Sequence, residues 1–62
     1  MKVGDLIRVR YATGDQWYHG VVYDEPDDPE SVNCIWHMWC LERAAVHVLA
    51  PYRDEIIVVS EG

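Results

Sequence analysis

Residues 32–39, VNCIWHMW, show the clearest alternation in the chain, with bulky side chains on both faces of an extended segment. One face would carry Cys34, Trp36 and Met38, and the other would carry Ile35, His37 and Trp39. Because successive residues of a strand point to opposite faces, the pattern predicts a central strand that is largely apolar on both sides. We expect one face to pack in a core and the other to meet a second layer, a partner or a ligand.

Four further strands are predicted by the same kind of alternation. Residues 6–11 alternate apolar side chains with Arg8 and Arg10, which is typical of a half-buried strand with one face in water. The other three segments are residues 17–25, 44–50 and 56–60. Gly20, inside the second segment, predicts a bulge, a bend or the close approach of another backbone. The last segment is a β-branched run that we expect to pair with the first.

The connections between these strands differ in length. Gly14 lies in a short turn and is expected to take the positive φ that a tight hairpin requires. Residues 24–30, DEPDDPE, hold five acids and two prolines and predict a long exposed loop. Pro51 ends the fourth strand, and residues 51–55 have room for one turn of 3₁₀ helix.

This order of elements predicts an all-β fold, a small five-stranded Src-homology-3-like (SH3-like) barrel with a 3₁₀ turn before the last strand. At 62 residues the chain has room for one domain, residues 1–62. A chain this short buries only about 60% of the surface that its unfolded form exposes, so its core alone gives marginal stability. We expect oligomerisation to supply the additional stability.

Four short motifs run through the chain: V-G-D-L-I-R-V at the start, G-V-V before the acidic loop, a central strand that ends in Trp, and I-I-V-V-S-E near the end. Together they resemble the short SH3-like proteins encoded by tailed bacteriophages and their bacterial hosts. The resemblance spans nearly the whole chain and implies the SH3-like fold and a phage or bacterial origin. It implies no activity, because most of those proteins have none assigned.

Peptide-binding members of the wider SH3-like class carry an A-L-Y-D-Y motif, an acidic loop, a tryptophan and a late P-x-x-Y. This chain has the acidic loop, Trp36 or Trp39, and the Pro51-Tyr52 pair. It lacks A-L-Y-D-Y and the P-x-x-Y spacing. Recognition of proline-rich peptides is therefore not implied by the resemblance.

The net charge is −6, from eleven Asp and Glu against five Lys and Arg, and a field of this sign repels phosphate backbones. Arg8 and Arg10 form the only basic row, which we expect to be solvated or paired with carboxylates across the sheet. Nucleic-acid binding is therefore the least favoured alternative. No apolar run approaches the ~18 residues of a membrane span and no export signal is recognisable.

Cys34, His37 and Cys40 form a C-x-x-H-x-x-C pattern that raises the alternative of a zinc site. In a strand, however, alternation sends His37 to the face opposite both cysteines, whereas tetrahedral ligands must converge on one ion. The two cysteines would also lie roughly 20 Å apart along a strand, too far for a disulfide. We expect free thiols, no metal and a cytoplasmic location, either host cytoplasm or virion if a phage encodes the chain.

No catalytic constellation is recognisable in the sequence. It contains no nucleophile beside a histidine in a familiar setting and no glycine-rich phosphate loop, and its carboxylates crowd into one solvated loop. A barrel filled by its own side chains is expected to leave no substrate cavity of about 300 Å³. We therefore expect a non-enzymatic protein that uses no cofactor.

The favoured function is a protein-interaction module that binds a protein or a basic peptide segment. In a barrel of this order, the acidic loop should lie beside aromatic residues of the central strand and the residue after the fourth-strand proline. Flat aromatic faces and carboxylates together suit proline rings, aliphatic stems and Lys or Arg. The predicted partner-binding residues are Asp24, Glu25, Asp27, Asp28, Trp36, Trp39 and Tyr52.

A self-assembling structural protein is the alternative from a different class. The chain holds seven Trp and Tyr residues, and a barrel of this size cannot bury all of them. An apolar patch left outside would bury itself in a symmetric homo-oligomer. The residues predicted for this patch are Trp17, Ile35, Trp39 and Val46.

Overall fold

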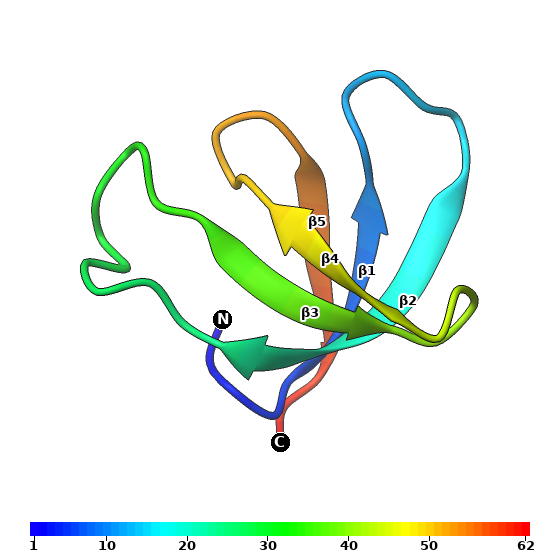
Figure 1. The fold of residues 1–62 in the computed structure, drawn as a ribbon, viewed down its shortest axis with the longest axis horizontal. Coiled ribbons are helices and arrows are strands. Elements are labelled where there is room, and N and C mark those ends of the chain that lie inside the picture. Colours follow the sequence, from blue (N-terminus) through cyan, green and yellow to red (C-terminus); the bar gives the residue numbers. More distant parts are fainter.

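In a computed structural model that describes all of residues 1–62, the chain forms one antiparallel sheet that curls around its own inner face (Figure 1). The strands are β1 (Leu6–Arg10), β2 (Trp17–Asp24), β3 (Trp36–Cys40), β4 (Ala45–Leu49) and β5 (Glu55–Ser60). Their order in the sheet is β4-β3-β2-β1-β5, so the last strand returns to pair with the first. The all-β, five-stranded prediction is confirmed, although the sheet does not close, because β4 and β5 are both edges.

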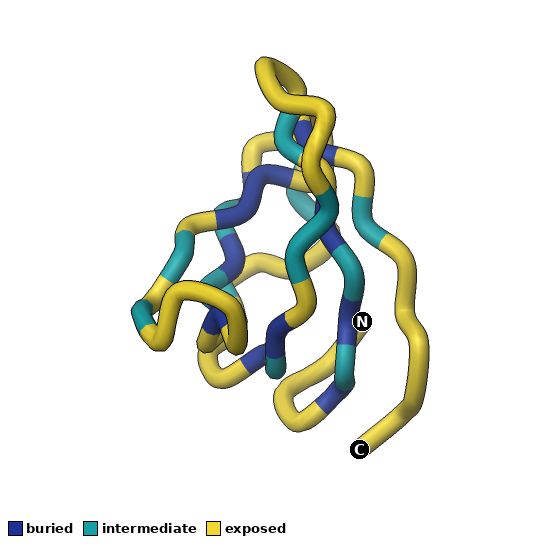
Figure 2. Tube along the Cα trace, turned by 90° about the vertical axis from the view of Figure 1, so that its right-hand side faces the viewer, coloured by how far each residue is buried: buried dark blue, intermediate teal, exposed yellow.

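The core is the inner face of the curled sheet. Its buried members come from every strand except β5 and from the residues before β3: Ile7, Val9, Val22, Cys34, Trp36, Met38, Cys40 and Leu49. Figure 2 shows the buried positions alternating along the inner strands, whereas the segment that leads to the C-terminus is exposed along most of its length. The predicted faces of the central strand are therefore confirmed. Both cysteines are buried free thiols.

Gly20 of β2 pairs with Cys40 of β3 in the ladder. A Cβ atom at this position would overlap with the Met38 Sδ and lie 2.7 Å from the Trp39 carbonyl oxygen. The absence of a side chain therefore lets β3 pack directly on β2, and the predicted close backbone approach is confirmed. The register of the sheet shifts elsewhere, between Val22 and Asp24 on β2 and between Leu6 and Ile7 on β1.

The central strand is shorter than predicted, because it begins at Trp36 rather than at residue 32. Residues 31–33 form a turn in which the Asn33 N–H donates to Ser31 Oγ at 3.3 Å and the Cys34 N–H donates to the Ser31 carbonyl oxygen at 3.2 Å. A serine that bonds the backbone locally competes with ladder hydrogen bonds. The loop between β2 and β3 therefore covers residues 25–35.

The prediction of a positive φ at Gly14 is wrong. Only Gly4, with φ 96°, and Ala44, with φ 49°, have a positive φ. The connection between β1 and β2 covers residues 11–16, and this length reverses the chain without a left-handed residue. Ala44 instead takes that conformation in the tighter turn between β3 and β4.

The segment after Pro51 forms a single hydrogen-bonded turn and no helix. The Arg53 N–H donates to the Ala50 carbonyl oxygen at 2.8 Å, which is the i,i+3 bond of a 3₁₀ turn, and the Asp54 N–H donates to the same oxygen at 2.7 Å. The chain then enters β5 at Glu55. No helix anywhere in the structure is long and apolar enough to cross a membrane.

Candidate binding groove

An open groove of about 790 Å³ lies between β5 and the loop that precedes β3. Seven of its eleven lining residues are hydrophobic, so its surface suits apolar side chains. The lining residues are Met1, Pro29, Glu30, Ser31, Val32, Cys34, Trp36, Pro51, Tyr52, Ile56 and Val58. The expectation that the barrel leaves no cavity of about 300 Å³ is therefore wrong. The reason is that the sheet stays open beside β5.

The wall that β5 contributes follows from its register with β1. Ile56 pairs with Val9 and Val58 pairs with Ile7, so both β5 side chains point to the inner face where their partners are buried. No further strand covers them, and Val58 keeps an exposed fraction of 41%. The groove is thus the part of the inner face that the five strands leave uncovered.

Trp36 and Trp39 lie on opposite faces, which corrects their grouping in one predicted binding surface. Trp36 is buried in the core and only its edge reaches the groove, whereas Trp39 is 44% exposed on the outer face. The physical reason is the strand period of two, since residues three apart cannot share a face. Tyr52, which is 63% exposed, shares the groove with Trp36.

The acidic loop supplies negative charge to one side of this groove. No side chain among its five acids makes a hydrogen bond or an ion pair, while Asp5, Glu42, Asp54, Glu55 and Glu61 all have cationic or histidine partners. Glu30 lines the groove directly, although it was not among the predicted partner-binding residues. The Ser31 N–H donates to the Asp28 carbonyl oxygen at 3.1 Å, which ties the loop to the groove wall.

The predicted acidic residues are distributed along the exposed loop rather than inside the groove. Asp24 ends β2 opposite His37, and Glu25, Asp27 and Asp28 are exposed. None of these four lines the groove. Among the acids of the loop, Glu30 alone reaches the groove surface, and the next residue along the chain, Ser31, also lines it.

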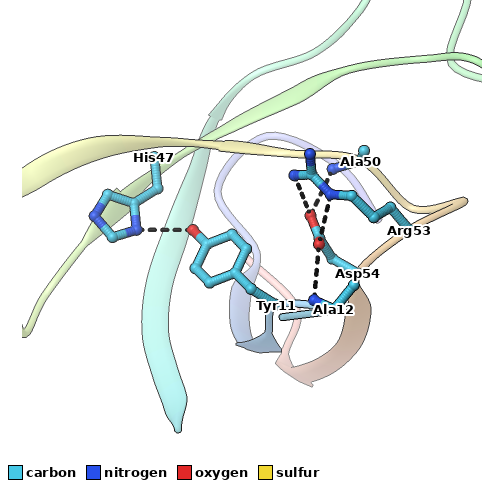
Figure 3. A network of polar contacts seen from close by, with 6 residues as sticks. All are labelled: Tyr11, Ala12, His47, Ala50, Arg53 and Asp54. Carbon is cyan, nitrogen blue, oxygen red and sulfur yellow. Dashed lines mark hydrogen bonds and ion pairs between the residues drawn. The ribbon is translucent and has the colours of Figure 1, made fainter. Parts of the chain in front are cut away.

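Asp54 holds the turn that presents Pro51 and Tyr52. Its buried carboxylate accepts hydrogen bonds from the Ala50 N–H at 3.0 Å and the Ala12 N–H at 3.4 Å, and it pairs with the Arg53 guanidinium at 2.9 Å (Figure 3). Burial by itself would raise the pKa of Asp54, but the Arg53 guanidinium and the two N–H donors outweigh it and lower the pKa below 3.8.

Asp5 ties both ends of the chain together beside the groove. Its carboxylate accepts the Gly62 N–H at 3.1 Å and the Lys2 N–H at 2.9 Å. The bond from Gly62 is the main reason that the pKa of Asp5 lies below 3.8, since burial acts in the opposite direction. The contacts position Met1, which lines the groove, and the end of β5.

Tyr11 links β1 to β4, although these strands share no ladder. Its hydroxyl lies 2.7 Å from His47 Nδ1 (Figure 3), and its ring packs against Tyr18 with centroids 5.9 Å apart. Burial raises the pKa of Tyr11 to about 12, with a further contribution from the charges of Cys40 and Asp54. This side-chain contact joins β4 to the residue that follows β1, where no backbone ladder connects the two strands.

The outer face carries a straight apolar row across four strands. The register pairs Leu6 with Val21, Val21 with Trp39 and Trp39 with Val46. Trp39 and Val46 are 44% and 45% exposed, so two members of the predicted oligomer patch are direct neighbours on an open surface.

The other two members of the predicted oligomer patch lie elsewhere. Trp17 is four residues from Val21 on β2, roughly 13 Å along the strand, and Ile35 is half-buried ahead of β3. Trp17 is covered by arginines, with the Arg8 and Arg10 Cζ atoms 4.5 and 5.3 Å from its ring centroid. The structure therefore does not unite the four residues in one patch.

The basic row of β1 is partly neutralised. Arg10 forms an ion pair with Glu55 of β5 at 2.8 Å, which confirms the predicted cross-strand pairing for this residue. Arg8 has no carboxylate partner and lies over the Trp17 ring.

The residues of the C-x-x-H-x-x-C pattern lie on opposite faces of the sheet. His37 lies on the outer face with its ring centroid 6.2 Å from that of Tyr23, while Cys34 and Cys40 lie in the core.

In comparisons with known proteins, no family model, no curated protein and no solved structure matches this chain. The resemblance to phage-encoded SH3-like proteins stays a prediction. The groove, the acidic loop and the outer row must therefore be interpreted from their own chemistry.

Proposed function

We propose that this protein is a non-enzymatic interaction module that binds a basic, partly apolar segment of a partner protein in the groove beside β5. The observation that carries the proposal is the combination of an open apolar groove with a neighbouring loop whose five carboxylates have no partner in the chain. We further propose a phage or bacterial origin and action in the cytoplasm, on the strength of the sequence motifs and the free thiols.

The two parts of the site suit different parts of one ligand. The groove surface would remove aliphatic side chains or proline rings from water, at about 25 cal/mol per Å² of apolar area. The exposed Tyr52 ring offers a face for a ring or a cation. The loop carboxylates would attract Lys or Arg and speed association with a basic segment.

An array of random octapeptides tests the proposal directly. The protein should select sequences that combine Lys or Arg with apolar residues. The Asp27→Asn/Asp28→Asn variant should slow association and reduce its salt dependence, whereas Tyr52→Ala should mainly speed dissociation. Selection of acidic peptides, or of no class of peptide at all, would contradict the proposal.

Two variants on β5 provide a matched control. Val58 and Ile57 are neighbours with exposed fractions of 41% and 43%, but Val58 points into the groove and Ile57 points to the outer face. Val58→Lys should weaken binding of the selected peptides at least tenfold, because it places a cation in their site. Ile57→Lys, with the same change of charge, should leave the affinity within twofold.

Self-assembly is the second candidate function, and the outer row of Leu6, Val21, Trp39 and Val46 favours it. A contiguous apolar row on an exposed sheet face often marks an interface. Light scattering at micromolar concentration should then show a homo-oligomer that Trp39→Lys converts to a folded monomer. A wild-type monomer that stays folded on dilution would remove this candidate.

A further inference from the structure

The free edge of β5 runs along the groove. β5 pairs only with β1, and no backbone N–H or C=O of Glu55–Ser60 bonds to any residue outside that ladder. Figure 2 shows the same strand as the exposed, outermost segment before the C-terminus. An edge of this kind presents a row of unpaired donors and acceptors to any chain beside it.

The groove lies on the open side of this edge. Ile56 and Val58 supply one wall from β5, while Val32 and Cys34 supply the facing wall from a loop that forms no strand. A peptide bound there would contact the apolar side chains of the groove, and its backbone would lie next to the unpaired edge of β5.

We infer that the partner segment binds in an extended conformation as a sixth strand on β5, antiparallel or parallel to it. This inference rests on the proposed function and names its binding mode. Backbone hydrogen bonds to β5 would provide affinity, and every second side chain would enter the groove over Ile56, Val58 and the Trp36 edge. The segment should therefore carry apolar residues at alternate positions and Lys or Arg where its side chains reach the acidic loop.

Charge favours such a partner over a second copy of this chain. The acids at the two ends of this edge, Glu55 and Glu61, are paired with Arg10 and Lys2, so the charge that opposes a second copy is that of the rest of the chain. Each copy would also add a net charge of −6 and another acidic loop. The β4 edge is a poorer site, because no β4 residue lines the groove and the inward-facing His47 already contacts Tyr11.

The experiment uses the octapeptide that binds most tightly in the array, made in three forms. One form is unmodified, and the other two are N-methylated at the odd or at the even backbone positions. Because alternate residues of a strand direct their N–H groups to a given neighbour, methylation in one register should weaken binding at least tenfold more than methylation in the other. Calorimetric titration measures all three affinities.

The outcomes separate the two proposals. If the unmodified octapeptide fails to bind, the proposed function itself fails. If it binds but the two methylated forms bind equally, the groove is a peptide site without strand addition, and only the binding mode is overturned. Hydrogen exchange gives an independent readout: β5 amides that do not face β1 should gain protection on peptide binding, while β4 amides should not. Protection of those β5 amides in the free protein at high concentration would instead assign the edge to a second copy.

Discussion

Gly20 is the single residue on which the contact between β2 and β3 most directly depends, because a Cβ atom there would collide with Met38 and with the Trp39 carbonyl group. Backbone cannot give way as a flexible side chain can. Gly20→Ala should therefore lower the free energy of unfolding by about 2 kcal/mol, as overpacking in a dense core does. Urea denaturation measures this change.

Gly14→Ala is the matched control at the residue scale. A Cβ atom at Gly14 would meet only the Tyr11 carbonyl oxygen, at 3.9 Å, and its φ is not positive. This variant should be neutral or up to about 1 kcal/mol more stable, since alanine restricts the unfolded chain. Equal destabilisation by both substitutions would contradict the close-packing account of Gly20.

At the scale of elements, the turn between β4 and β5 depends on one buried carboxylate. Asp54→Ala would leave the Ala50 and Ala12 N–H groups without their acceptor and the Arg53 guanidinium without its partner. We expect a loss of about 2 kcal/mol in the free energy of unfolding, the scale of a buried hydrogen-bonding group left unpaired. Asp15→Ala, which removes a carboxylate with no partner, should change stability little, and a similar loss in both variants would count against this role.

The same turn places Tyr52 at the groove. A substitution that weakens this turn should therefore reduce peptide binding as well as the stability of the fold. Stability and peptide affinity should therefore fall together in Asp54→Ala. In Tyr52→Ala, by contrast, affinity should fall while the free energy of unfolding stays close to that of the wild type, because Tyr52 is mostly exposed.

At the scale of the whole molecule, acid should unfold the protein through Asp5 and Asp54. Both have a folded-state pKa below the ordinary 3.8, so the unfolded chain takes up protons first as the pH falls. Their contribution is fully present above about pH 5 and is lost as the pH falls through 3.8 towards the lowered values.

The melting temperature should therefore be nearly constant from about pH 7 to pH 5 and should fall steeply below about pH 4. Asp5→Asn should make this fall shallower, because it removes one of the carboxyl groups whose lowered pKa drives it. An unchanged pH profile in Asp5→Asn would show that the bonds from Gly62 and Lys2 do not stabilise the folded chain.

Much of the fold could be predicted from local pattern. The alternation around Trp36 and Met38 identified the core face of β3, and Gly20 signalled a close approach, because both depend only on side-chain direction and size. The start of β3 could not be predicted, since Ser31 diverts the backbone through hydrogen bonds that alternation does not reveal. The groove was not predicted either, because Ile56 and Val58 alternate along β5 as core residues do. Alternation shows which face a side chain is on but not whether another strand covers that face.

The sequence by itself determined the number of strands, their inner and outer faces, and the acidic loop, because side-chain periodicity and charge are properties of short segments. Only the tertiary structure decided that the sheet remains open between β4 and β5, since closure depends on how far five twisted strands curl. That global geometry leaves Ile56 and Val58 uncovered, so that part of a core face becomes a groove, and the end of the acidic loop at Glu30 lines it.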